Sequence, residues 1–187
     1  MGESLKKLAK VKVLLGVSGG VAAYKAVDLA SKLTSAGASV QTVMTENAGR
    51  LVGAKSFEAV TCGRVYTSLW SEEEEYRIGH INITDWADVI VVAPATANII
   101  GKAANGIADD LLSTTLCTCW QKPCLIAPAM NTRMWENPAV RRNVEFLKGM
   151  GYRIIGPEAG RLACGTEGVG RMSEPEKILE AIVEIIG

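Results

Sequence analysis

The apolar run at Val11–Val17, which only Lys12 interrupts, constrains the fold more than any other feature of the sequence. A strand with one face in water alternates apolar and polar residues, whereas a continuous apolar strand is buried on both faces, as in a parallel sheet covered by helices. Asp88–Ala93 is nearly as apolar, and Cys124–Ala127 is a shorter run of the same kind. We therefore expect a parallel sheet with helices on both of its faces.

Helical sequence separates these runs. A helix is predicted at Val21–Ala36, because it stops at Gly37, a residue suited to the left-handed conformation that often ends helices. Ser173 and Glu176 have the spacing of a capping box at the start of a C-terminal helix. The remaining predicted elements are strands at Ser39–Met44 and Tyr152–Ile155, helices at Asp110–Trp120 and Asn137–Gly149, and an irregular polar segment at Val60–Gly79. Because strands and helices alternate throughout, the sequence predicts a single α/β domain over residues 1–187, with a doubly wound, Rossmann-like parallel sheet.

The charges and the apolar segments exclude some classes of function. The 20 basic and 20 acidic residues cancel, so no overall field attracts nucleic acid or an anionic membrane. The longest apolar stretch, Val89–Ile100, is too short to span a bilayer and is broken by Pro94 and Asn98. The charged N-terminus does not resemble a signal peptide. A phosphate-binding site in this chain therefore has to be formed by a small group of neighbouring residues and not by the overall charge of the protein.

The five cysteines form no disulfide framework, because their number is odd. A reducing, cytoplasmic compartment is the simplest explanation. Cys117 and Cys119 form a CxC motif with Cys124 nearby, which suggests a metal site. However, the only histidine, His80, lies far away in the sequence, and Asp110–Trp120 is typical of a buried helix. We therefore interpret these cysteines as small apolar residues and expect no bound metal.

Four segments follow predicted strands and are expected at the carboxyl edge of the sheet, where open α/β folds bind ligands. They are Gly16–Gly20, Thr45–Asn47, Pro94–Asn98 and Pro128–Trp135. The first resembles a phosphate-binding turn, but its glycines lack the G-x-G-x-x-G spacing of dinucleotide sites, which favours a mononucleotide. An ordinary tight turn explains it equally well. Thr96 and Asn98 suit either a ligand or the cap of the next helix.

Three other features indicate chemistry without assigning it. Pro128–Trp135 places two Met and one Trp in a loop, where their exposure is costly unless they line a pocket or an interface. His80 is the only histidine, and the residues alone leave open whether its role is structural or catalytic. Cys164 lies in Gly160–Arg171, a glycine-rich segment of the mobile kind that forms lids over active sites.

These features occur in a characteristic order: His80 ahead of the WAD strand, then PATAN, PAMNTRMW and LACGTEGVGR. With them the chain, from GVSGGVAAYK to RMSEPEKI, resembles the homo-oligomeric flavin-containing cysteine decarboxylases over nearly its whole length. Within that family it is most similar to the branch that acts on 4′-phosphopantothenoylcysteine in coenzyme A biosynthesis.

The resemblance implies a role for each matching residue. His80 matches the family's base, Asn131 matches the group that holds the cysteinyl carboxylate, and Cys164 matches the proton donor of the final reduction. Contacts to the cofactor FMN are implied for Ser18, Gly19, Thr45, Pro94, Ala95, Thr96, Asn98 and Ala129, and contacts to the substrate for Met130, Asn131, Met134 and Ala163.

The resemblance also implies the reaction and the partners. In the family, oxidation of the cysteinyl thiol carbon gives a thioaldehyde, loss of CO₂ gives an enethiolate, and reduction gives 4′-phosphopantetheine. Family members are trimers or dodecamers with the flavin between subunits. Many are fused to a phosphopantothenoylcysteine synthetase, so this chain is expected to be a stand-alone enzyme or the N-terminal domain of a bifunctional one.

Three alternatives stay open beside this interpretation. A peptidyl C-terminal cysteine oxidative decarboxylase is the nearest, but such relatives lack a cysteine in the glycine-rich segment. A non-catalytic, flavoprotein-like regulatory subunit of a phosphatase is disfavoured by the joint presence of His80, Asn131 and Cys164. A flavin prenyltransferase shares the expected fold, but PAMNTRMW and the glycine-rich segment do not suit it.

Overall fold

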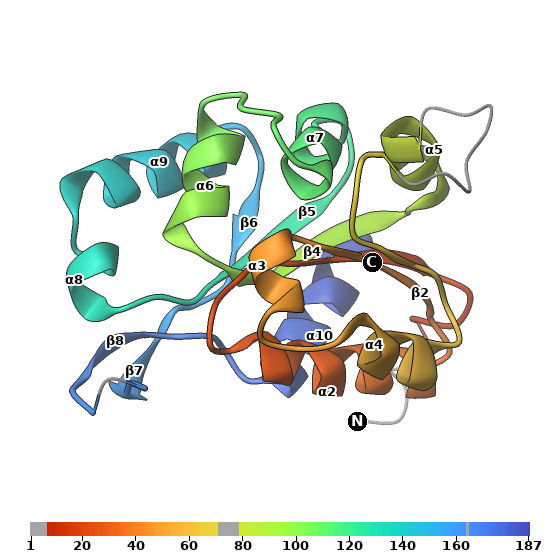
Figure 1. The fold of residues 1–187 in the computed structure, drawn as a ribbon, viewed down its shortest axis with the longest axis horizontal. Coiled ribbons are helices and arrows are strands. Elements are labelled where there is room, and N and C mark those ends of the chain that lie inside the picture. The colour runs from red at the N-terminus through yellow and green to blue at the C-terminus, as the bar shows by residue number, and fades with distance from the viewer. Residues whose placement is uncertain (1–6, 71–78, 164) are drawn as a thin grey trace.

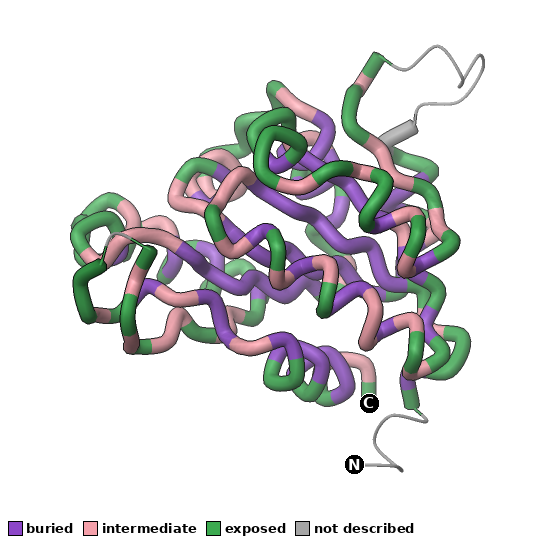
Figure 2. Tube along the Cα trace, turned by 60° about the horizontal axis from the view of Figure 1, so that its bottom comes forward, coloured by how far each residue is buried: buried purple, intermediate pink, exposed green. Residues whose placement is uncertain are grey.

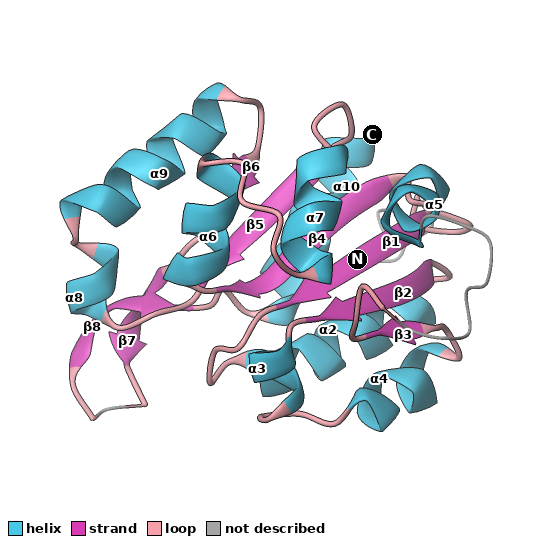
Figure 3. Ribbon diagram, turned by 45° about the horizontal axis from the view of Figure 1, so that its top comes forward, coloured by secondary structure: helices cyan, strands magenta, loops and turns pink. Residues whose placement is uncertain are grey.

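The computed structural model describes residues 7–70, 79–163 and 165–187, with only the backbone at 79 and 80. Six parallel strands form the central sheet (Figure 1), and Figure 3 labels them in the order β3-β2-β1-β4-β5-β6. They are β1 (Lys12–Val17), β2 (Ser39–Met44), β3 (Val65–Tyr66), β4 (Val89–Ala95), β5 (Cys124–Pro128) and β6 (Arg153–Ile154). The chain moves outward from β1 to β3 and then starts again at β4, so a topological switch point lies between β1 and β4. The predicted doubly wound parallel sheet is confirmed.

Helices cover both faces of the sheet (Figure 3). One face carries α2 (Ala23–Ser35), α4 (Ala54–Thr61) and α10 (Pro175–Ile186), and the other carries α5 (Gly79–Trp86), α6 (Ala97–Ala104), α7 (Leu111–Thr118) and α9 (Pro138–Gly149). Each face has its own core, because alternate residues of a strand point to opposite sides; Leu15 packs in the first core and Leu14 in the second. Figure 2 shows the resulting band of buried central strands. Two short helices, α3 (Glu46–Gly49) and α8 (Thr132–Trp135), follow β2 and β5.

Local signals place several elements where they were expected. Gly37 follows the end of α2 with φ +89°, the left-handed conformation that glycine adopts without steric cost. Asn137 caps α9 and Pro138 takes its first position. Within the described residues, no helix is both long and apolar enough to cross a bilayer.

Two local predictions are wrong. The capping box at Ser173 and Glu176 does not form, because Pro175 takes the first helical position and Glu174 becomes the N-cap residue of α10. The segment predicted to be irregular, Val60–Gly79, contains the end of α4 and the edge strand β3, and α5 begins at its last residue. A two-residue strand is too short to leave a periodic pattern.

The glycine-rich segment forms an antiparallel hairpin of β7 (Glu158–Arg161) and β8 (Glu167–Arg171). Neither strand was expected, because glycine is depleted in strands. The hairpin stands apart from the central sheet, next to α8 (Figure 1). Its position beside the carboxyl end of β5 makes it a wall for any ligand at that edge.

Candidate functional site

One buried serine holds the switch point together. Ser18 Oγ donates a hydrogen bond to the carbonyl oxygen of Pro94 (2.7 Å) and accepts one from the backbone N–H of Thr96 (2.9 Å). Ser18 is 1% exposed and does not line the pocket described below. Its hydroxyl therefore joins the ends of β1 and β4 and positions Thr96, and the FMN contact that the resemblance implies for Ser18 stays a prediction.

The turn after β1 presents backbone donors. No group among the described residues accepts a hydrogen bond from the N–H of Gly19, Val21 or Ala22. All three residues line the pocket and lie at the N-terminus of α2, where the helix dipole favours an anion. Gly19 is required here, because a Cβ would overlap the side chain of Asn47. The turn is thus arranged to bind an anion.

The neighbouring loops contribute fewer side chains than expected. Thr96 lines the pocket and also caps α6. Pro94 and Ala95 are buried in β4, and Asn98 is exposed on α6 outside the pocket lining. Thr45 caps α3 and does not line the pocket either. Of the residues predicted after β2 and β4, only Thr96 lines this pocket.

The segment after β5 forms the next wall. Asn131 caps α8, since its side-chain oxygen accepts from the N–H of Arg133 (2.9 Å), and this bond orients the amide beside the pocket. Ala129, Met130 and Met134 line the pocket with it. These four residues were all expected at the site, and they lie together because α8 starts directly at the end of β5.

Trp135 behaves differently from the other apolar residues of PAMNTRMW. It is buried in the core of the α9 face, with the Arg141 guanidinium 4.8 Å from its ring centroid. This cation–π contact anchors α8 to α9. Trp135 therefore supports the site from behind and does not line the pocket.

The hairpin packs directly on this segment. The N–H of Met130 donates to the carbonyl oxygen of Gly170 (2.9 Å). A Cβ at Gly170 would overlap the Met130 carbonyl, and one at Gly168 would overlap the Thr132 hydroxyl, so only glycine lets β8 lie this close. Ala163, beyond β7, lines the pocket. Cys164, the predicted proton donor, lies outside the described residues.

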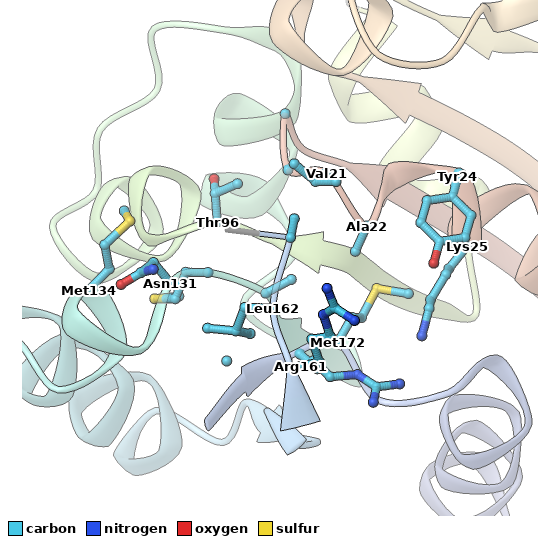
Figure 4. A pocket seen from close by; sticks show the side chains of 17 residues that line it. Val21, Ala22, Tyr24, Lys25, Thr96, Asn131, Met134, Arg161, Leu162 and Met172 are labelled. Atoms are coloured by element: carbon cyan, nitrogen blue, oxygen red, sulfur yellow. The ribbon is translucent and has the colours of Figure 1, made fainter. Parts of the chain in front are cut away.

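The turn, Thr96, the α8 segment and the hairpin enclose a pocket of about 520 Å³. Figure 4 shows Thr96 and Asn131 at one side of it and Tyr24 and Lys25 at the other, with Arg161 between them. The basic residues Lys25, Arg161 and Arg171 all line it. Sequence reasoning missed these cations, because single basic residues outside a motif are usually solvated surface groups.

The predicted base is not near this pocket within one chain. His80 lies in the first turn of α5, and its side chain is outside the described part. Figures 1 and 3 both show α5 at the opposite end of the molecule from α8 and the hairpin. A single chain therefore does not unite all the residues that the sequence had assigned to catalysis.

Two of the three cysteines predicted to be small apolar residues, Cys119 and Cys124, belong to the core, whereas the third, Cys117, does not. Cys119 and Cys124 are buried, and burial raises the pKa of the Cys124 thiol, which keeps it protonated. Cys117 is exposed on the same helix end. Among the described residues, no three His, Cys, Asp or Glu side chains are grouped in a way that would hold a metal ion.

The amino-acid sequence matches a protein-family model and several curated proteins. Residues 1–187 match the family described as Flavoprotein. The chain is 54% identical over 168 residues to the coenzyme A biosynthesis bifunctional protein CoaBC of Bacillus subtilis, and 42% identical over 176 residues to that of Escherichia coli. These matches cover 90% and 94% of this chain, but only 41% and 43% of the relatives. The chain thus spans about two fifths of the length of these curated relatives.

Three solved structures share the fold over more than nine tenths of the chain. A PPC decarboxylase mutant complexed with pantothenoylaminoethenethiol is 36% identical with a TM-score of 0.85, covering 92% of this chain and 96% of that one. The FMN-binding protein AtHal3 is 36% identical with a TM-score of 0.81, covering 94% and 96%. The peptidyl-cysteine decarboxylase EpiD is 25% identical with a TM-score of 0.78, covering 95% and 98%. With fold and sequence in agreement from end to end, the chain belongs to the Flavoprotein family.

Proposed function

We propose that this chain is a carboxy-lyase, the FMN-dependent decarboxylase that converts 4′-phosphopantothenoylcysteine to 4′-phosphopantetheine in coenzyme A biosynthesis. The observation that carries the proposal is the 54% identity to CoaBC of Bacillus subtilis over 90% of the chain. The pocket supports it, because an anion-binding turn, the amide of Asn131 and a glycine-rich hairpin meet at the switch point of the sheet. Ligands of open α/β folds bind at this place.

The residues of the pocket fit FMN. The N–H groups of Gly19, Val21 and Ala22, which donate to no group in the described part of the chain, suit a phosphate monoester at a helix N-terminus. Thr96, held by Ser18, and the small side chain of Ala129 leave room for a flat ring. Bound FMN supplies reversible two-electron chemistry, which no protein side chain provides.

The chain's own residues bind, orient and move protons. Asn131 lines the pocket, and its side-chain oxygen accepts a hydrogen bond from the N–H of Arg133; we assign its amide group to the substrate carboxylate. We assign Cys164 as the acid that protonates the enethiolate carbon, and His80 as the base of the initial oxidation, which requires a pKa near neutrality. The hairpin excludes water from the pocket between these steps.

We further propose a homotrimer, or a larger assembly of trimers such as a dodecamer, with the site shared between subunits. Because α5 lies far from α8 in one chain, His80 can reach a pocket only in another copy. The rim of the pocket supports this arrangement, since Val21, Tyr24 and Met134 are 65%, 62% and 47% exposed and a neighbouring subunit would bury them.

The proposal extends to the wider context of the reaction. The CoaBC relatives are more than twice as long as this chain, which supports a phosphopantothenoylcysteine synthetase as a fused or separate partner. The free cysteines among the described residues support a reducing compartment, which we take to be the cytoplasm. The competing activity is peptidyl-cysteine decarboxylation, because EpiD has the same fold.

The test combines a spectrum with a substrate comparison. The purified protein is expected to be yellow, with about one FMN per chain and a mass that is a multiple of three chains by light scattering. It should convert 4′-phosphopantothenoylcysteine and leave a peptide with a C-terminal cysteine unchanged. A colourless protein that FMN does not reconstitute, or turnover of the peptide alone, contradicts the proposal.

A further inference from the structure

A charged cluster that the proposed reaction does not use lies beside the pocket. The carboxylate of Glu174 accepts hydrogen bonds from Lys25 Nζ at 2.7 and 2.8 Å and from the Arg171 guanidinium at 2.8 Å. The hydrogen bonds from Lys25, with a smaller contribution from Arg171, hold the pKa of Glu174 below its ordinary value. Glu174 is therefore an anion between two cations at neutral pH.

The cluster joins three elements that are far apart in the sequence. Lys25 is on α2, just after the anion-binding turn, and its side chain is 15% exposed. Arg171 is the last residue of β8, and Glu174 is the N-cap residue of α10. The Glu174 side chain makes no capping hydrogen bond to its own helix. Its carboxylate oxygens accept hydrogen bonds from Lys25 and Arg171 instead, whereas the side-chain oxygen of an N-cap residue ordinarily accepts one from the first turn of its own helix.

Arg171 extends this connection to the other strand of the hairpin. A Cβ built on Gly160 of β7 would lie 2.6 Å from Arg171 Nη1 and 2.9 Å from Arg171 Cδ. The Arg171 side chain therefore lies against the β7 backbone while its guanidinium contacts Glu174. One carboxylate thus ties both strands at the base of the hairpin to α2 and α10.

We infer that Glu174 is a positioning residue that holds the hairpin over the pocket and so determines whether the decarboxylated intermediate is reduced before it escapes. The inference rests on the proposed function. An intermediate that escapes is the enethiol, from which CO₂ and one hydride equivalent have been removed. The normal product regains that hydride from the cofactor and one proton from Cys164. Each enethiol that escapes leaves one hydride equivalent behind on the cofactor. A second turnover of this kind therefore requires an oxidant, and dioxygen in the assay buffer is that oxidant.

The experiment compares Glu174→Gln with Glu176→Gln. Glu176 is the matched control, because it lies in the first turn of α10 and pairs with another lysine of α2, Lys32, at 3.2 Å. Unlike Lys25, Lys32 does not line the pocket. Neutral Gln at position 174 leaves Lys25 and Arg171 as neighbouring cations without a counter-ion, which should loosen the base of the hairpin.

Two measurements are made on each variant. Amide hydrogen exchange in residues 158–171 should become several-fold faster in Glu174→Gln and stay unchanged in Glu176→Gln. Mass spectrometry of the reaction mixture should show about a threefold rise in the ratio of enethiol to 4′-phosphopantetheine for Glu174→Gln only, the size expected for loss of a partly exposed ion pair. The FMN content should not change.

If Glu174→Gln does not fold, Arg171→Gln replaces it and should give the same shift in the product ratio. When both single variants fold, the double variant should shift the ratio little further, because both substitutions break the same contact. Unchanged hairpin exchange, or loosening with an unchanged product ratio, overturns the inference. Failure of the proposed function is a separate result, because the wild-type protein would then form neither product.

Discussion

The floor of the pocket and the hairpin above it are built in opposite ways. The floor consists of loops that continue directly from β1 and β4, and its key polar atom, Ser18 Oγ, is buried between two backbone partners. The hairpin belongs to neither layer of the fold. It is attached by the backbone bond from Met130 to Gly170, by the ion pairs of Glu174, whose side chain is 40% exposed, and by the ion pair of Glu158 with Lys177 of α10.

This difference separates two tasks. A buried hydrogen bond has no water to replace a lost partner, so the floor keeps one geometry and suits a cofactor that stays bound. Exposed ion pairs are typically worth about 0–1 kcal/mol, so a wall held by them can open for substrate and product. The four predictions that follow test this division, beginning with the largest expected effect.

The first prediction concerns His80, which lies far from the pocket of its own chain, and Asn131, which lines that pocket. His80→Asn and Asn131→Asp should each lower turnover by about 10²-fold or more, because the first removes the base and the second places a carboxylate against the substrate's own. FMN should stay bound in both. If the site is shared between subunits, an equal mixture of the two variants, unfolded and reassembled, should regain about one quarter of the wild-type activity. No recovery in correctly assembled mixtures would place both residues in the same chain's site.

The second prediction concerns Cys164, which lies between β7 and β8 in the sequence. Cys164→Ser should still oxidise and decarboxylate the substrate, but reduction should stall, because a serine hydroxyl is a far weaker acid than a thiol with a pKa of about 8.5. The product should be the enethiol, lighter than 4′-phosphopantetheine by two hydrogens (about 2 Da) in the mass spectrum. Near-normal yield of 4′-phosphopantetheine would remove Cys164 from the mechanism and favour the peptide-decarboxylase alternative.

The third prediction concerns the floor. Ser18→Ala leaves the half-buried N–H of Thr96 and the carbonyl of Pro94 without the hydroxyl between them, which should lower the free energy of unfolding by about 1–3 kcal/mol. FMN should be retained less well, because Thr96 is no longer held. Denaturant unfolding and the flavin content measure both effects. Ser56→Ala, at an exposed serine of α4, is the control and should change neither; a stable Ser18→Ala variant with full flavin content would show that the floor does not depend on this serine.

The fourth prediction is the smallest and concerns pH. The pKa of Glu174 is lowered, chiefly by Lys25, from an ordinary value of 4.5, so its carboxylate contributes to the folded state above that pH and the contribution is lost as the pH falls through the lowered pKa. Below about pH 4, amide exchange in the hairpin, corrected for intrinsic rates, should rise before exchange in β1 and β4. The Ser18 hydrogen bonds contain no titrating group and should not respond in this range. Parallel changes in both regions would contradict the division.

Much of the fold follows from local patterns. The apolar run at Val11–Val17 forms β1, buried on both faces from Val13 onward, and Gly37 ends α2 with a left-handed backbone. Part of the site follows as well, because parallel strands end at one edge of the sheet and thereby bring Gly19, Thr96 and Asn131 to one pocket. Hydrophobic period and turn chemistry act over a few residues, so they can be read without knowing the packing.

Tertiary structure alone decided the rest. Ser18 turns inward because the loop after β4 lies beside it with an open carbonyl and N–H, a contact across 76 residues. Glu174 pairs with Lys25 across 149 residues and so leaves its own helix uncapped. The sequence by itself determined the layers, the order of elements and the edge where ligands bind. The packing of distant segments decides which polar groups face the pocket and which form hydrogen bonds inside the protein, and no local pattern encodes that packing.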